Sequence, residues 1–151
     1  VHADEPERRN WFHDPFIQLS DGLSSCPQPA GPYITEQQRR EQAHHRLERG
    51  TSCWLAGQCE HPNYYGDDAA IAVQMQQAWY SLRTRGKNSL WLTVQGRIVI
   101  IQGCAQGRDL ASELETMARK IPKVQGVLVQ ISIDPEKPAP YPVLPPGTPL
   151  Q

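Results

Sequence analysis

The chain has 151 residues, with 15 Lys and Arg against 16 Asp and Glu, so its formal net charge at pH 7 is −1. This length suits one domain, or a small domain with extended flanks. The balanced charge argues against a nucleic-acid-binding protein that works through overall positive charge. No apolar run approaches the roughly 20 residues that a membrane-spanning helix needs, so we expect no transmembrane segment.

The first residues favour export from the cytoplasm. Val1, His2 and Ala3, followed by an acidic residue, match the small-x-small pattern that precedes a signal-peptidase cut. A cut near Ala3 would leave a periplasmic or secreted chain. A cloning boundary at the same place is the alternative explanation.

The four cysteines are an even number, which in an exported chain favours two disulfides. Cys53 and Cys59 are close in the sequence and flank a turn that contains glycine, so a local bridge is feasible, and Cys26 would then pair with Cys104. The crossed pairing remains an alternative. A zinc site is disfavoured because the C-x5-C-x-H spacing that ends at His61 matches no common zinc pattern. We therefore predict no metal and no cofactor.

Residues 1–33 are predicted to form an irregular N-terminal segment, because they contain five prolines and no sustained hydrophobic period. Their apolar residues form one cluster, which we expect to dock on a core. The members of this cluster are Trp11, Phe12, Phe16, Ile17 and Leu19.

Residues 34–66 are predicted to hold one polar helix and a loop that contains cysteines. The helix should span 35–49, with Thr35 and Gln38 forming a capping box at its start and Gly50 ending it. Its surface is polar nearly all round, so it should pack weakly or hold a partner.

Residues 67–134 carry the strongest periodic signals. An amphipathic helix is followed by a hairpin whose turn is placed at Gln95–Gly96, and then by a second amphipathic helix and a last strand. Gly103 is expected to end the second strand of the hairpin, and Gly126 to let the chain reverse before the last strand. The predicted helices span 67–83 and 108–121, and the predicted strands span 90–95, 97–103 and 127–133.

The buried stripes of the two helices follow from their helical spacing. The first stripe consists of Ile71, Met75, Ala78 and Leu82, and the second consists of Leu110, Leu114, Met117, Ala118 and Ile121.

Residues 135–151 form a proline-rich tail. Seven prolines fall within the last 18 residues, so this segment cannot join a central sheet and should be extended or resemble polyproline II. A disordered tail and a ligand for an aromatic groove are the two alternatives.

The segment 67–133 resembles the BON domain of bacterial envelope proteins. The likeness rests on the stretches VQGRIVIIQGC and IPKVQGVLVQISI, in which glycines punctuate alternating apolar residues. The family pattern V-x-G-x-V-x-L-x-G and the entry to its last strand fall on Val94, Gly96, Ile98, Ile100, Gly103, Val124, Gly126, Val127 and Val129.

This resemblance implies an α+β fold of the order αββαβ, with a three-stranded sheet and two helices on one face. It further implies a periplasmic or exported setting and binding of phospholipid or another envelope component. Residues 14–65 look like an extension seen in some proteobacterial members. The family has no catalytic motif to carry over.

A candidate binding surface lies on the first helix of this BON-like part and on the link after it. Aromatic rings beside cations suit a membrane interface, because the rings sit at headgroup depth and the cations attract anionic lipid. The alternative is that Trp79 and Trp91 are buried under the N-terminal segment. The candidate residues for a lipid or a partner are Gln76, Trp79, Tyr80, Arg83, Arg85, Lys87 and Trp91.

The sequence contains no recognisable motif for a catalytic nucleophile, base and acid, and no phosphate-binding glycine loop. We therefore predict a non-catalytic envelope-binding module that recognises anionic phospholipid. The alternative is a protein-interaction or scaffold component of an envelope or secretion assembly, with the 35–49 helix and the tail making the contacts. A hydrolase or redox enzyme is a third hypothesis, without support from a motif.

Overall fold

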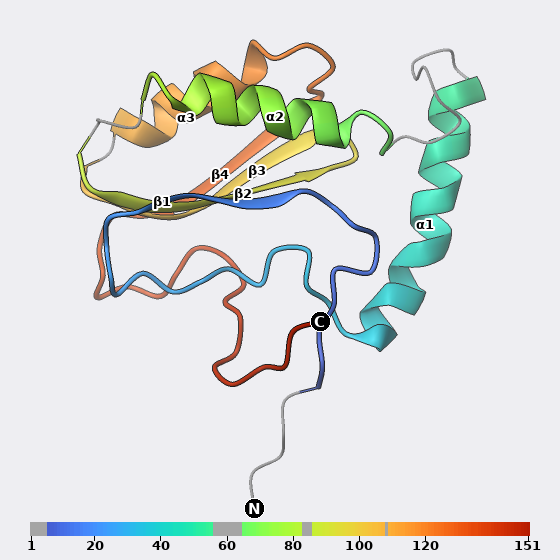
Figure 1. Cartoon of the computed structure of the whole chain (residues 1–151), viewed down its shortest axis with the longest axis horizontal. Coiled ribbons are helices and arrows are strands. Elements are labelled where there is room, and N and C mark those ends of the chain that lie inside the picture. The colour runs from blue at the N-terminus through green and yellow to red at the C-terminus, as the bar shows by residue number, and fades with distance from the viewer. Residues whose placement is uncertain (1–5, 56–64, 83–85, 108) are drawn as a thin grey trace, which may run out of the picture.

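The computed structural model describes residues 6–55, 65–82, 86–107 and 109–151, with the backbone alone described for 48–55. It has an α+β fold, as predicted (Figure 1). The elements in chain order are β1 (Phe16–Asp21), α1 (Glu36–Leu55), α2 (Asp68–Trp79), β2 (Asn88–Gln95), β3 (Ile98–Ala105), α3 (Asp109–Arg119) and β4 (Gly126–Ser132).

The sheet is mixed and has four strands in the order β1-β2-β3-β4. The pairs β1–β2 and β2–β3 are antiparallel, whereas β3 and β4 are parallel and are joined through α3. The prediction of a three-stranded sheet was wrong, because β1 comes from the segment that was expected to be irregular. Ile17 and Leu19 of this strand pack against the core, as the apolar cluster suggested.

One face of the sheet is covered by α2 and α3, and the main core lies between these layers (Figure 1). Ile71, Met75 and Leu114 are at most 1% exposed, so the predicted stripes do face the sheet. Alternate residues of the central strands complete this core. They are Leu90, Leu92, Val94, Val99 and Ile101.

The β2–β3 hairpin turns at Gly96 and Arg97, one residue later than predicted. Both residues have positive φ, 58° and 67°, as a type I′ turn requires. The carboxylate of Asp68, at the start of α2, accepts hydrogen bonds from the backbone N–H groups of both residues, each at 2.8 Å. Asp68 therefore holds Arg97, a non-glycine residue, in a left-handed backbone conformation that usually costs about 1–2 kcal/mol.

Gly103 does not end β3 but lies inside it, opposite Leu90. Its φ is 148°, and a Cβ built on it would lie 2.0 Å from the backbone oxygen of Ser89. The residue is a glycine because the neighbouring strand passes too close for a side chain.

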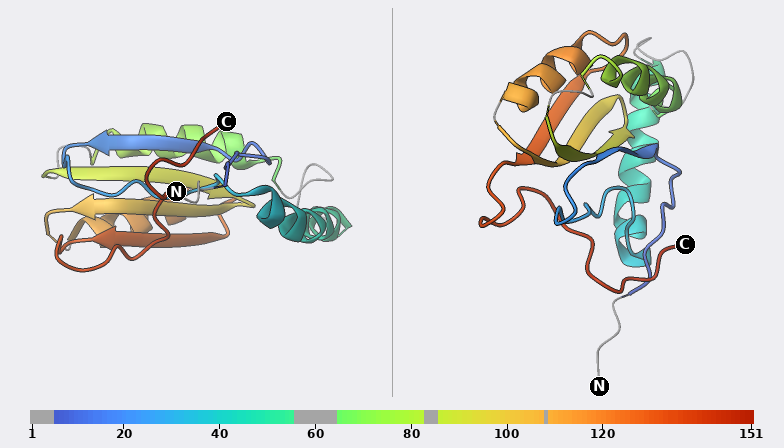
Figure 2. Two further views of the ribbon diagram at one scale, coloured as in Figure 1. Left: turned by 90° about the horizontal axis from the view of Figure 1, so that it is seen from below. Right: turned by 60° about the vertical axis from the view of Figure 1, so that its left-hand side comes forward.

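Helix α1 continues past the predicted end at residue 49 and includes Gly50. The predicted capping box is present: the Thr35 backbone N–H donates to Gln38 Oε1 at 3.0 Å, and the Gln38 N–H donates to Thr35 Oγ1 at 3.3 Å. The helix stands beside the sheet rather than on it (Figure 2).

The second face of the sheet is covered by irregular chain from both ends of the sequence (Figure 1). The proline-rich tail runs beside the N-terminal segment, with single bridges between Pro29 and Val143 and between Arg8 and Leu150. Tyr141 in the tail is only 6% exposed. The tail is therefore extended, as predicted, but it is part of the folded layer and is not a free peptide.

Candidate functional site

The predicted binding surface does not include its two tryptophan rings. Trp79 is 5% exposed and belongs to the core between α2 and the sheet. Trp91 is 7% exposed and alternates with Leu90 and Leu92, so its ring lies on the opposite face, under the irregular segments. Both rings are buried, as the alternative expected, because each gains more from burial than from a place at the surface. Only Trp91 lies under the irregular segments, whereas Trp79 is covered by its own helix and the sheet.

The polar members of the predicted surface divide into two groups. Gln76, Tyr80 and Lys87 are exposed, with Tyr80 at 67%. Arg83 and Arg85 lie outside the described residues.

The solvent side of α2 carries no charged side chain. Residues 69–82 contain no Asp, Glu, Lys or Arg. By contrast, the exposed sides of α1 and α3 carry ion pairs between Glu36 and Arg40 and between Glu115 and Arg119. We call the exposed residues of α2 and its C-cap the neutral face; they are Ala69, Ala70, Val73, Gln76, Gln77 and the C-cap residue Tyr80.

A groove of about 790 Å³ runs between α2 and α3, beside the neutral face. Its lining includes the apolar side chains of Leu82, Met117 and Ile121 and the polar side chains of Gln77 and Lys120. The groove can therefore take a group that has both apolar and polar atoms.

A buried ion pair joins α1 to the rest of the molecule. Arg46 donates from both terminal nitrogens to the carboxylate of Asp14, at 2.8 and 2.6 Å. Its guanidinium lies over the rings of Phe12 and Tyr65, at 3.9 and 4.7 Å from their centroids. Gln95 Nε2 donates to the same carboxylate at 3.2 Å. A cavity of about 240 Å³ beside the pair is lined by Gln42, His45, Arg46, Tyr65, Gln95, Ile98 and Ile100.

A second buried charge cluster fixes the hairpin turn to the start of α2. Asp67 accepts hydrogen bonds from Arg97 Nη2 at 2.6 Å and from Lys123 Nζ at 3.2 Å. Burial alone would raise the pKa of Asp67, but the hydrogen bonds and charges of Arg97 and Lys123 outweigh it, so the pKa lies below its usual value. For Asp68, burial dominates over the hydrogen bonds from the two backbone N–H groups, and its pKa is raised. Both carboxylates hold the turn, which is a structural task.

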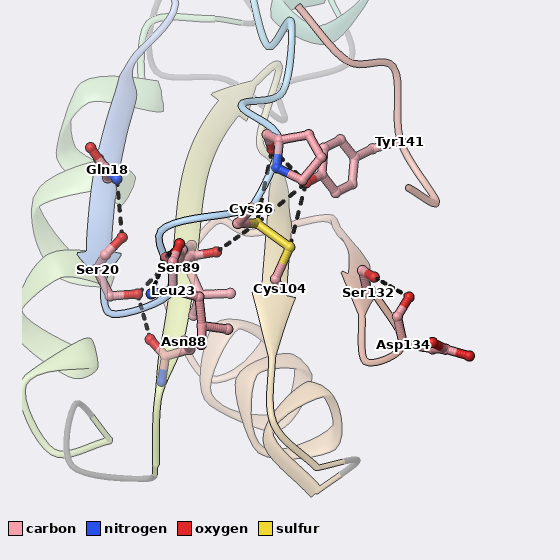
Figure 3. Close-up of a disulfide and its surroundings, with 12 residues drawn as sticks. Gln18, Ser20, Leu23, Cys26, Asn88, Ser89, Cys104, Ser132, Asp134 and Tyr141 are labelled. Carbon is pink, nitrogen blue, oxygen red and sulfur yellow. Dashed lines mark hydrogen bonds between the residues drawn. A yellow bond between two sulfur atoms is a disulfide. The ribbon is translucent and has the colours of Figure 1, made fainter. Parts of the chain in front are cut away.

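The disulfide Cys26–Cys104 is present and ties the N-terminal segment to β3 (Figure 3). Tyr141 donates from its hydroxyl to the backbone oxygen of Pro27 at 2.6 Å and lies 3.6 Å from Cys26 Sγ. Burial raises the pKa of the Tyr141 phenol. The predicted Cys53–Cys59 bridge lies outside the described residues, except for the backbone of Cys53.

Neither a metal-binding cluster nor a membrane-spanning helix is found in the described parts of the chain. No three His, Cys, Asp or Glu side chains there gather as metal ligands would. No helix there is both long and apolar enough to cross a bilayer.

The chain has been compared with known families, curated proteins and solved structures. None of them matches it.

Proposed function

We propose that this chain is a non-catalytic binding module of the bacterial cell envelope that lies on anionic phospholipid through the neutral face of α2. The observation that carries the proposal is the 14-residue stretch 69–82, which has no charge although the helix is half exposed to solvent. A solvated helix gains from charged side chains on its outer face, as α1 and α3 illustrate. A neutral outer face suits a partner of low polarity.

The exposed side chains of α2 suit the headgroup region of a bilayer. Val73 is 53% exposed and Tyr80 is 67% exposed, and they lie seven residues apart on one side of the helix. A tyrosine ring places its apolar body among acyl chains and its hydroxyl in the headgroups. Lys87 is exposed directly before β2, and its cation attracts anionic lipid.

The resemblance to BON domains supports the same activity and setting. The elements from Asp68 to Ser132 follow the order helix, strand, strand, helix, strand. The family resemblance implies phospholipid binding in the periplasm or outside the cell, and the Cys26–Cys104 disulfide fits such an oxidising compartment.

A protein partner is the second candidate. It is favoured by α1, which stands beside the sheet and whose Leu47 side chain is 72% exposed. An exposed leucine on a mostly polar helix suits a contact with another protein.

The test is binding of the intact chain to vesicles of phosphatidylglycerol and, separately, of phosphatidylcholine. Wild type should bind the anionic vesicles more strongly, and salt should weaken this binding. Val73→Glu should reduce the affinity about tenfold or more, because it places a carboxylate at the bilayer surface. Val143→Glu is the matched control, since Val143 is 40% exposed in the tail, on the other side of the sheet.

Equal binding by the two glutamate variants would reject α2 as the lipid contact. No binding of wild type to either vesicle would reject the lipid proposal and leave α1 and its protein partner as the surviving candidate.

A further inference from the structure

The outer edge of β4 differs from most natural sheet edges. The strand pairs with β3 in unbroken register over seven residues, from Gly126 to Ser132. It contains no proline, bulge or charged side chain. Natural edge strands usually carry such features, which stop a second chain from pairing with them.

The other edge of the sheet has these protections. Strand β1 is shorter, its register shifts between Gln18 and Ser20, and it ends in Asp21. Among the described residues, no strand or loop makes a backbone pair with the outer edge of β4. The contrast indicates that one edge is protected and the other is left open.

The side chains of β4 that face the core are less buried than those of β3. Val99 and Ile101 of β3 are fully buried, and their register partners in β4 are Val127 and Val129. These two valines pack on the same core but are only partly buried. Since α3 already covers this side of the sheet (Figure 1), a further strand at the edge is what would complete their burial.

The charges that flank β4 have opposite sign at its two ends. Lys120 precedes the strand, whereas Asp134, Glu136 and Lys137 follow it, so these flanking residues have net charges of +1 and −1. Arg119 and Lys123 also precede the strand, but they are engaged in ion pairs with Glu115 and Asp67. Two copies of β4 that run antiparallel would each place the basic flank beside the acidic flank of the other. Two parallel copies would place like charges together.

We propose that β4 pairs antiparallel with β4 of a second copy of this chain, which forms a continuous eight-stranded sheet across a two-fold axis. Such an interface is self-complementary and closes at two copies. It pairs the outward-facing backbone N–H and C=O groups of both edges with each other in place of water. The proposal does not depend on the lipid-binding function.

The two-fold axis of an antiparallel edge pair stands perpendicular to the sheet. Helices α2 and α3 of both copies therefore lie on the same side of the joined sheet. The two neutral faces would point in the same general direction, so dimerisation and contact with one flat surface are compatible.

The first experiment is sedimentation velocity of the intact chain over a range of concentrations, together with amide hydrogen exchange at the lowest and highest of them. A monomer–dimer equilibrium is expected, with the amides of β4 more protected in the dimer and those of β1 unchanged. A monomer at every concentration, a dimer that leaves β4 unprotected, or open-ended assembly would each overturn the proposal.

Two sets of variants test the position and direction of the pairing. Leu128 is 46% exposed and lies next to the central residue of the strand, so Leu128→Lys should leave the monomer folded and place two ammonium groups near the axis. It should weaken dimerisation about a hundredfold, through like-charge repulsion and added desolvation. Val143→Lys, in the tail, is the matched control and should dimerise as wild type does.

Charge reversal tests the antiparallel direction. Lys120→Glu and Glu136→Lys change exposed side chains at opposite ends of β4. Each alone should weaken the dimer about tenfold, and the double variant should recover most of the loss. Failure of the double variant to recover, with both single variants weakened and folded, would reject the antiparallel arrangement.

Discussion

The guanidinium of Arg46 and the carboxylate of Asp14 form a two-pronged ion pair in which both side chains are at most 9% exposed. The partners are 32 residues apart, one in the middle of α1 and the other just before β1. The pair thus fastens a mostly polar helix to the segment that leads into β1, and Phe12 and Tyr65 exclude water from it.

Loss of one partner of this pair should be costly. Arg46→Met leaves the Asp14 carboxylate buried without its counter-charge, and we expect the free energy of unfolding to fall by about 3–5 kcal/mol. Urea unfolding followed by circular dichroism measures this loss. Hydrogen exchange should show that α1 amides lose protection before those of the sheet.

An exposed ion pair on the same helix provides the control. Arg40 pairs with Glu36 at 3.1 Å, and its side chain is 71% exposed. Arg40→Met should cost no more than about 0.5 kcal/mol. Equal losses for the two arginine variants would mean that Arg46 contributes through its helical position and not through Asp14.

Stability should fall in acid partly through Asp67. Its folded pKa lies below the ordinary value of 3.8. The stability that its pairs with Arg97 and Lys123 provide is therefore complete above pH 3.8 and is lost as pH falls through the lower, folded pKa. Asp67→Asn should be less stable at neutral pH and should show a shallower loss between pH 4 and pH 2 in urea titrations.

Asp68 should act in the opposite direction. Because its folded pKa is raised above 3.8, protonation of Asp68 adds stability that is complete below that value and is lost as pH rises through the folded pKa. The same urea titrations on Asp68→Asn should therefore lack this rise in stability toward low pH. An unchanged pH profile in both variants would contradict the assignment of these two carboxylates.

Removal of the Cys26–Cys104 disulfide should destabilise the covering layer. The bridge closes a loop with a sequence separation of 78 residues, and the double variant Cys26→Ser/Cys104→Ser should lose about 2–5 kcal/mol in chemical unfolding. Tyr141→Phe, which removes only the hydrogen bond to Pro27, should lose about 1 kcal/mol. If the serine pair is as stable as Tyr141→Phe, the layer is held by packing and not by the bridge.

Gly103→Ala should be among the most damaging single methyl additions in the chain. The new Cβ would lie 2.0 Å from the Ser89 oxygen, so β2 and β3 must separate, and we expect a loss of about 3–5 kcal/mol. Gly107→Ala is the control, because Gly107 also has a positive φ but nothing lies within 4 Å of the added Cβ. Thermal unfolding compares the two, and similar melting temperatures would show that β2 and β3 can move apart freely.

The sequence predicts those elements whose signal is local and repeated. The apolar periods of α2 and α3 and the alternation in the hairpin were sufficient to locate them within a few residues. The burial of Trp79 could also have been predicted, because Ile71, Met75 and Trp79 follow one another at intervals of four.

The remainder depends on contacts between distant segments. Strand β1 has six residues and follows Pro15, so its alternation is too short to distinguish it from a docked loop; only pairing with β2 makes it a strand. Gly50 indicated a helix end because glycine disfavours helix, but its penalty of about 1 kcal/mol did not end α1. Nothing in the pattern around Arg46 indicates that this arginine, among those of a polar helix, faces inward toward Asp14.

The bridge between Arg8 and Leu150 brings the two ends of the described chain together on the side of the sheet away from α2 and α3 (Figure 1). Residues near the two ends of the described chain are therefore neighbours in space. A short glycine-rich linker could join the ends, and the chain could then be opened at an exposed position elsewhere to give a circular permutant. A tag or an immobilising group at either end would likewise leave the helical side of the molecule accessible.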